Sequence, residues 1–171
     1  MSALPDILAP DLAVLFCGLN PGLSAAAEGH HFVGRGNRFW RTLHLAGFTP
    51  RPLDPSEDRR LLDYGCGLTT LVRRASAGAD ALSPAEYRGG GATLRDKVEH
   101  ARPKFVAFLG KAGWASLSDR RQVDWGPQPE GFGASGVWVL PNPSGRNRAF
   151  TLEGLVEAYR ALRAAAFAPG G

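Results

Sequence analysis

Apolar residues gather in four short runs along the chain, and each run is bounded by glycine, proline or polar residues. Short uninterrupted apolar runs between turn residues are typical of strands that are buried on both faces of a parallel sheet. The pattern therefore predicts buried strands over residues 12–18, 65–72, 104–109 and 136–140.

A second pattern lies between these runs, with apolar residues three or four positions apart, and it predicts amphipathic helices. Asn37 caps the first predicted helix, and Pro103 ends a later one because proline disfavours a helical residue before it. The predicted helices cover residues 38–46, a short segment capped by Ser56, residues 93–102, a segment opened by Gly110 and a final segment after Thr151.

The remaining segments are rich in glycine, proline and polar residues. We expect irregular structure in residues 1–11, 19–36, 73–91 with a turn of helix near 84–88, 118–135, and the terminal residues 168–171. The loop over 19–36 is long for a compact domain, and loops of that length are usually functional.

The alternation of strands and helices predicts an α/β fold with a mostly parallel sheet that is covered on both faces. A length of 171 residues and a hydrophobic fraction of 44% suit one domain with a substantial core, over residues 1–171. No segment resembles a linker that would divide the chain.

Two of the predicted strands end in an Asn-Pro turn. Residues 12–18 lead into Gly18-Leu19-Asn20-Pro21-Gly22, and residues 136–140 lead into Pro141-Asn142-Pro143-Ser144-Gly145. Asparagine and proline are common turn formers, so each segment taken alone favours a structural turn over a functional loop. Since ligands of open α/β sheets bind beyond the carboxyl ends of the strands, we expect both loops to reach one ligand-binding edge.

The charge pattern adds a polyanionic partner to this picture. The net charge is +4, and the stretch from Gly29 to Leu53 holds four arginines and no acidic residue. Arg146 and Arg148 follow the second Asn-Pro loop, again with no acid before Glu153. Guanidinium groups suit phosphates, although a compositional bias toward arginine explains the scarcity of lysine equally well.

Several classes of protein are disfavoured by composition. No apolar run approaches the ~20 residues that a membrane span needs, and the first residues do not resemble a signal peptide, so we expect a cytoplasmic protein. The two cysteines, Cys17 and Cys66, are too few for a four-thiolate metal or iron–sulfur site in one chain. We expect them to be reduced and, for Cys17, buried.

Three motifs together resemble one enzyme family. They are Gly18-Leu19-Asn20-Pro21-Gly22-Leu23-Ser24, Asn37-Arg38-Phe39-Trp40 and Asn142-Pro143-Ser144-Gly145, in this order along the chain. They resemble the family of the mismatch-specific uracil-DNA glycosylases and thymine-DNA glycosylases. Residues 61–65 and 155–160 are similar to the bacterial mismatch-specific branch of that family.

The resemblance implies a three-layer α/β/α domain that flips a uracil out of duplex DNA and hydrolyses its N-glycosidic bond, without a cofactor or metal. It implies that Asn20 positions the attacking water. The Phe32 ring would stack on the flipped base, while the Phe32 amide and the Leu19 carbonyl would read its edge. The sequence alone allows Phe32 to be a plug that anchors its loop instead. Asn142 takes the place where related enzymes carry a catalytic histidine, which implies slower chemistry and broader base tolerance.

The same resemblance implies that the residues after Asn142 form a wedge that fills the gap in the duplex and contacts the DNA backbone: Ser144, Gly145, Arg146 and Arg148. The bacterial relatives carry an apolar residue where this chain has Arg146. Thr70 replaces a lysine and Ala25 replaces a small hydroxyl residue. We expect Arg146 to weaken the discrimination for an opposing guanine, and Ala25 to leave more room or fewer polar contacts near the base.

Other polar residues near the motifs have two interpretations each. His30 and His31 are expected to be loop or phosphate contacts rather than metal ligands, and Asp63 to be structural rather than an acid or base. Arg38 and Arg41 are phosphate contacts or part of a solvated helix face.

The resemblance predicts a monomeric repair enzyme that acts on double-stranded DNA with uracil mismatches. The alternatives are a non-catalytic nucleic-acid-binding domain and a nucleotide-binding α/β enzyme. The second alternative lacks a Gly-x-Gly-x-x-Gly fingerprint after a strand.

Overall fold

The structure, a computed structural model that describes residues 4–169, is built on a five-stranded sheet in the order β2-β1-β3-β5-β4. Four strands are parallel and match the predicted apolar runs, and β4 pairs antiparallel with β5 at one edge. The strands are β1 (Val14–Gly18), β2 (Cys66–Thr70), β3 (Phe105–Leu109), β4 (Gly126–Pro127) and β5 (Gly136–Leu140). The carboxyl ends of the four parallel strands therefore lie at one edge, as expected.

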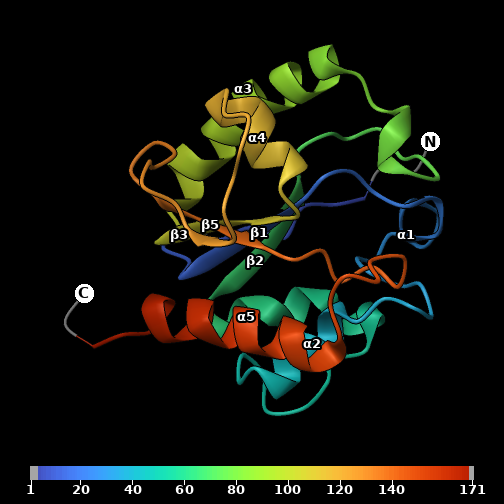
Figure 1. The fold of residues 1–171 in the computed structure, drawn as a ribbon. Helices are drawn as coiled ribbons and strands as arrows, with labels where there is room; N and C mark the ends of the chain where they lie inside the picture. Colours follow the sequence, from blue (N-terminus) through green and yellow to red (C-terminus); the bar gives the residue numbers. More distant parts are fainter. Residues whose placement is uncertain (1–3, 170–171) are drawn as a thin grey trace.

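Helices cover both faces of the sheet, which confirms the three-layer α/β/α fold. Figure 1 shows α3 (Pro84–Ala101) and α4 (Ala112–Ser118) on one side, with α2 (Phe39–Leu45), α5 (Leu152–Ala166) and the 3-10 helix η1 (Pro55–Tyr64) on the other. Alternate residues of β1 serve the two sides: Phe16 joins the core under α2 and α5, and Leu15 joins the core under α3 and α4. Burial on both faces explains why the strands are continuously apolar.

Two segments that were predicted to be irregular contain helix. The loop over 19–36 holds the six-residue helix α1 (Leu23–Glu28). The helical turn predicted near 84–88 is confirmed, but α3 continues from it through residues 89–91, which were predicted as a glycine-rich connection, into the helix predicted over 93–102. The glycines of α3 serve close packing: a Cβ at Gly90 would overlap the Leu71 carbonyl oxygen, and one at Gly91 would lie 2.5 Å from Leu117. The prediction was wrong because glycine lowers helix propensity, whereas tertiary packing decides here. A second short 3-10 helix, η2 (Ala79–Ala81), precedes α3.

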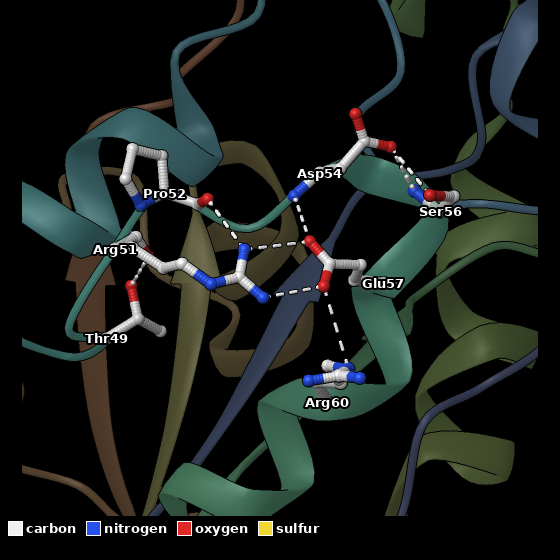
Figure 2. Close-up of polar contacts among 7 residues, drawn as sticks. All are labelled: Thr49, Arg51, Pro52, Asp54, Ser56, Glu57 and Arg60. Atoms are coloured by element: carbon white, nitrogen blue, oxygen red, sulfur yellow. Dashed lines mark hydrogen bonds and ion pairs between the residues drawn. The ribbon is translucent and has the colours of Figure 1, made fainter.

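The start of η1 differs from the prediction by two residues, because Asp54 and not Ser56 is its cap. The Asp54 carboxylate accepts a hydrogen bond from the Ser56 amide, and Glu57 reaches back to the Asp54 amide (Figure 2). Both terminal nitrogens of Arg51 donate hydrogen bonds to the Glu57 carboxylate, and this pairing lowers the pKa of Glu57 to about 2. This exposed network orders the turn between α2 and η1.

The start of the chain differs from the expected irregular arm, whereas Ala168 and Pro169 are irregular as predicted. Ile7 forms an antiparallel bridge with Leu68, so the described part of residues 1–11 adds to the sheet. Residues 1–3 and 170–171, at the ends of the predicted irregular segments, lie outside the described residues.

Cys17 and Cys66 are buried and unbridged, and burial raises the pKa of each thiol to about 12. Within residues 4–169, no helix has the length and apolar character that crossing a membrane requires.

Candidate active site

A cleft of about 670 Å³ opens at the carboxyl edge of the sheet, and both Asn-Pro loops line it. Asn20 follows β1, Asn142 follows β5, and Leu109 at the end of β3 lies between them. In Figure 1 the loop after β5, in orange, reaches the side of the sheet where α1 lies. The cleft also contains most of the residues that the sequence singled out: Leu19, Ala25, Phe32, Thr70, Ser144 and Arg146.

The side-chain amide of Asn20 has one possible orientation. Its nitrogen, Nδ2, donates to the Arg74 carbonyl oxygen at 2.8 Å and to Ser76 Oγ at 2.8 Å. A carbonyl oxygen only accepts hydrogen bonds, so the nitrogen and not the oxygen must face Arg74. Both amide protons are used, and among residues 4–169 no group donates to Asn20 Oδ1. That oxygen is an available acceptor in the cleft.

The side-chain amide of Asn142 is held the other way round. Its oxygen, Oδ1, accepts from the Ser144 backbone amide at 2.8 Å, as in other asparagine turns. Within the described part of the chain no acceptor faces its nitrogen, so Asn142 Nδ2 is an available donor. The loop is fixed on both sides, since Asn147 donates to the Asn142 carbonyl and the buried Tyr159 hydroxyl donates to the Pro141 carbonyl.

Arg38 proves to be a structural support of the second loop rather than a solvated residue. Its guanidinium donates to four backbone carbonyls, those of Phe150, Ser144, Asn147 and Pro143, at 2.7, 2.9, 2.9 and 3.4 Å. These bonds occupy four of the five N–H donors of the guanidinium, so Arg38 is committed to the loop rather than to a phosphate. The sequence placed Arg38 in a family motif but gave no sign of this role.

Gly145 allows the loop after β5 to approach the loop that follows α1. A Cβ at Gly145 would lie 2.7 Å from the Gly36 carbonyl oxygen, so a larger residue would push the two loops apart. This contact and Arg38 tie the two halves of the cleft together.

The position of Phe32 fits both interpretations that the sequence left open, a plug that anchors its loop and an aromatic face toward the ligand. Its ring packs on Phe39 with centroids 4.1 Å apart and an interplanar angle of 28°, and it also lines the cleft. Its φ of 56° is unusual for a residue with a side chain and signals a backbone that the surroundings hold in place. Leu19 lines the cleft too, and its carbonyl already accepts one hydrogen bond from the Val72 amide.

The neighbours of Phe32 supply the restraint. The buried Asp58 carboxylate accepts from the His31 amide at 3.0 Å and lies 3.3 Å from His30 Nδ1. The His31 ring contacts the Pro5 carbonyl, and Trp40 donates to the His31 carbonyl. Burial lowers the pKa of His31, which is therefore a neutral loop anchor rather than a phosphate contact. The sequence did not identify Asp58, since nothing in its local pattern marks it.

Arg146 and Arg148, which are expected to contact DNA, are exposed but not equivalent, and Ser144 is half-buried. The Arg146 guanidinium donates to the Ala77 carbonyl at 3.3 Å, and its amide donates to Ser144 Oγ. Arg148 and Arg41 are exposed and lie outside the cleft lining. Asp63 is exposed at the far end of η1, before β2, so it is remote from the carboxyl edge and does not line the cleft.

The cleft is lined by amide, aromatic and small residues rather than by metal ligands. In the part of the chain that the structure describes, no three His, Cys, Asp or Glu residues converge on a common point.

Comparisons with known proteins bear on the family and the fold of the chain. The sequence model of the family described as the Uracil DNA glycosylase superfamily matches residues 5–163. The fold is similar to the solution NMR structure of a protein from Methanosarcina acetivorans that is described as a candidate uracil DNA glycosylase. The TM-score is 0.61 at 21% sequence identity, and the similarity covers 95% of this chain and 98% of the other.

Proposed function

This chain belongs to the uracil DNA glycosylase superfamily, and we propose that it hydrolyses the N-glycosidic bond of uracil in duplex DNA, notably in U:G mismatches. The products are free uracil and an abasic site. The observation that supports this most is the pair of oppositely held asparagines in one cleft, an available acceptor on Asn20 and an available donor on Asn142. Its motifs favour the bacterial mismatch-specific branch.

Asn20 Oδ1 orients the attacking water. An amide is too weak a base to deprotonate water fully, so the glycosidic bond must break before the water attacks. The sugar then carries oxocarbenium character, and a weak, well-placed nucleophile captures it. The held nitrogen of Asn20 keeps the acceptor oxygen in the cleft, where the water is needed.

The leaving uracil takes the electron pair of the broken bond and needs hydrogen-bond donors. Asn142 Nδ2 supplies donors that are preorganised by the Ser144 contact, and preorganised donors at a developing anion are among the largest contributions to catalysis. An amide does not become a cation as histidine does, so we expect moderate rates. The base itself stacks on the open face of Phe32 and meets the Phe32 amide and the Leu19 carbonyl at its edge.

The exposed loop after β5 contacts the DNA duplex. The uracil leaves the helix because its sugar carbon is hard to reach in a stacked duplex. Ser144, Gly145 and Arg146 fill the space that it vacates, and Arg148 contacts the backbone. The substitution of an apolar wedge by Arg146 relaxes the preference for an opposing guanine. We propose that the protein acts as a cytoplasmic monomer and needs no cofactor.

The direct test incubates the protein with labelled oligonucleotides that contain U:G, U:A, T:G or single-stranded uracil, followed by alkaline cleavage of abasic sites. We expect clear release from U:G and weak or no release from T:G. Asn20→Ala is the matched control, and it should retain DNA binding while losing release. A folded protein that binds these duplexes and releases no uracil from any of them would be a binding domain, and the proposal would be wrong.

A further inference from the structure

The segment that follows β2 runs beside the first Asn-Pro loop, and we call residues 71–78 the strap. The Leu71, Val72 and Ser76 amides donate to the carbonyls of Gly18, Leu19 and Pro21 at 2.8, 2.8 and 3.1 Å. The strap thus extends the β1–β2 pairing beyond the sheet. Its position alongside the loop allows it to hold the Asn20 side chain from outside the motif.

A relay of two hydrogen bonds within the strap determines how Asn20 is held. The Ser76 hydroxyl is buried and donates its only proton to the Gly78 carbonyl at 2.8 Å. Because that proton is committed, Ser76 Oγ must accept from Asn20, which fixes Asn20 Nδ2 as the donor at 2.8 Å. The bonds from Asn20 to Ser76 and from Ser76 to Gly78 polarise each other in the same direction.

The strap is itself anchored to the start of α3. The Arg74 guanidinium donates to the Glu86 carboxylate at 2.7 and 3.1 Å and to the Ala81 carbonyl at 2.7 Å. Glu86 belongs to the capping box with Ser83, so it is fixed by the helix, and the contact with Arg74 lowers its pKa to about 2. The Arg74 carbonyl that accepts from Asn20 therefore belongs to a residue whose side chain is tied down.

We propose that Ser76 is a positioning residue that holds the amide nitrogen of Asn20 and thereby directs Asn20 Oδ1 at the attacking water. The Arg74–Glu86 pair stabilises the strap that carries Ser76. This inference rests on the proposed glycosylase function, but it makes a statement about the Asn20 side chain that is measurable without substrate. It also predicts that a carboxylate at position 20 would be held less well than the amide, because an ionised carboxylate has no proton for the Arg74 carbonyl.

The test compares Ser76→Ala with Ser135→Ala as a matched control. Ser135 is also buried, and its hydroxyl donates to one backbone carbonyl, that of Pro103. Both residues precede strands, so they lie at the amino edge of the sheet, opposite the edge that carries the cleft loops. Both variants lose a buried hydroxyl, so a general loss of stability affects both. Only Ser76→Ala removes an acceptor from Asn20.

Two measurements follow on each variant. Under single-turnover conditions with U:G duplex, we expect Ser76→Ala to lower the rate constant about five- to tenfold, with duplex affinity within twofold, as loss of one hydrogen bond implies. In NMR spectra, the Asn20 side-chain amide, identified by its absence in Asn20→Ala, should shift and exchange faster with solvent. Ser135→Ala should leave both readouts at the wild-type value.

Glu86→Gln provides a second variant that does not touch the buried hydroxyl. Glutamine keeps the capping box and removes the charge that holds Arg74, so we expect a two- to threefold lower rate constant. An unchanged Asn20 amide signal in folded Ser76→Ala would overturn the inference. So would equal rate losses in Ser76→Ala and Ser135→Ala. If the wild type releases no uracil, the proposed function fails, and the NMR readout alone still decides the role of Ser76.

Discussion

The two Asn-Pro loops have the same pair of residues at the same edge of the sheet, and the structure holds their asparagines in opposite ways. In the first loop the amide nitrogen of Asn20 is occupied and the oxygen is available. In the second loop the oxygen of Asn142 is occupied and the nitrogen is available. Two chemically identical side chains thus present different groups to the cleft, an acceptor from Asn20 and a donor from Asn142. In each case, the atom that is already hydrogen-bonded within the protein determines which atom is left available.

The two loops also differ in what supports them. The first loop depends on the strap, which runs beside it beyond the end of β2, and the Asn20 side chain finds both of its partners there. The second loop is closed by the turn from Asn142 to Ser144 and is held by Arg38, which precedes α2, and by Tyr159 of α5. The difference predicts that equivalent substitutions in the two loops have unequal consequences.

The largest effect is expected for Asn20→Asp. The introduced carboxylate would set an acceptor against the Arg74 carbonyl, so we expect a loss of ~2 kcal/mol in stability and a rate of uracil release lowered about 10³-fold. The folded state raises the pKa of the new carboxyl, because protonation restores the donor. The stability loss should therefore be largest at neutral pH and shrink as the pH falls through that raised value.

Thermal unfolding at neutral and mildly acid pH measures this, with single-turnover kinetics at neutral pH. Asn20→Ala is the control, since it removes the amide without adding a charge, and its stability deficit should not depend on pH. A pH-independent deficit in Asn20→Asp would show that Arg74 and Ser76 do not hold the side chain as the geometry indicates.

Asn142→Asp is expected to separate activity from stability. One carboxylate oxygen keeps the Ser144 amide as its donor, so the turn survives and the unfolding temperature should stay close to that of the wild type. The other oxygen replaces a donor by a negative charge beside the leaving uracil anion. We expect uracil release to fall about 10²-fold, the usual cost of losing one preorganised donor.

The comparison of unfolding temperatures tests the contrast directly. Asn142→Asp should unfold several degrees above Asn20→Asp at neutral pH, although both variants are poor enzymes. Equal destabilisation of the two variants would contradict the opposite orientations of the two amides.

The sequence predicted the sheet well, because buried parallel strands leave uninterrupted apolar runs such as residues 104–109. It also placed both Asn-Pro loops at one edge of the sheet, where the structure has them. It did not predict that the helical turn near 84–88 continues through residues 89–91 into the next helix, because the glycines that disfavour a helix locally are required where α3 contacts Leu71 and Leu117. Local propensity and tertiary packing disagree there, and packing decides.

For the site, the sequence located both asparagines but not the residues that orient them. Ser76, Arg38 and Asp58 act on backbone or side-chain atoms at least 27 positions away. Long-range polar contacts of this kind leave no periodicity and no spacing in a single sequence. The orientation of an asparagine side-chain amide can therefore be determined only once the fold shows which groups surround it.

The smallest effect is expected for Arg146, which links the second loop to the strap through the Ala77 carbonyl. This contact is single, 3.3 Å long and exposed, so Arg146→Ala should leave stability within ~0.5 kcal/mol of the wild type. When DNA binds, we expect the Arg146 side chain to exchange the Ala77 carbonyl for a contact with the duplex. The affinity of Arg146→Ala for DNA should therefore fall severalfold, and the salt dependence of binding should weaken by about one counterion. Arg146→Leu places an apolar side chain at the proposed wedge position, so it separates the effect of charge from that of shape. It should bind more weakly than the wild type and yet prefer U:G over U:A more strongly. Fluorescence anisotropy at several salt concentrations, with release assays on both duplexes, measures each quantity. An unchanged preference in Arg146→Leu would mean that the opposing base is read by the fixed part of the second loop rather than by its exposed arginine.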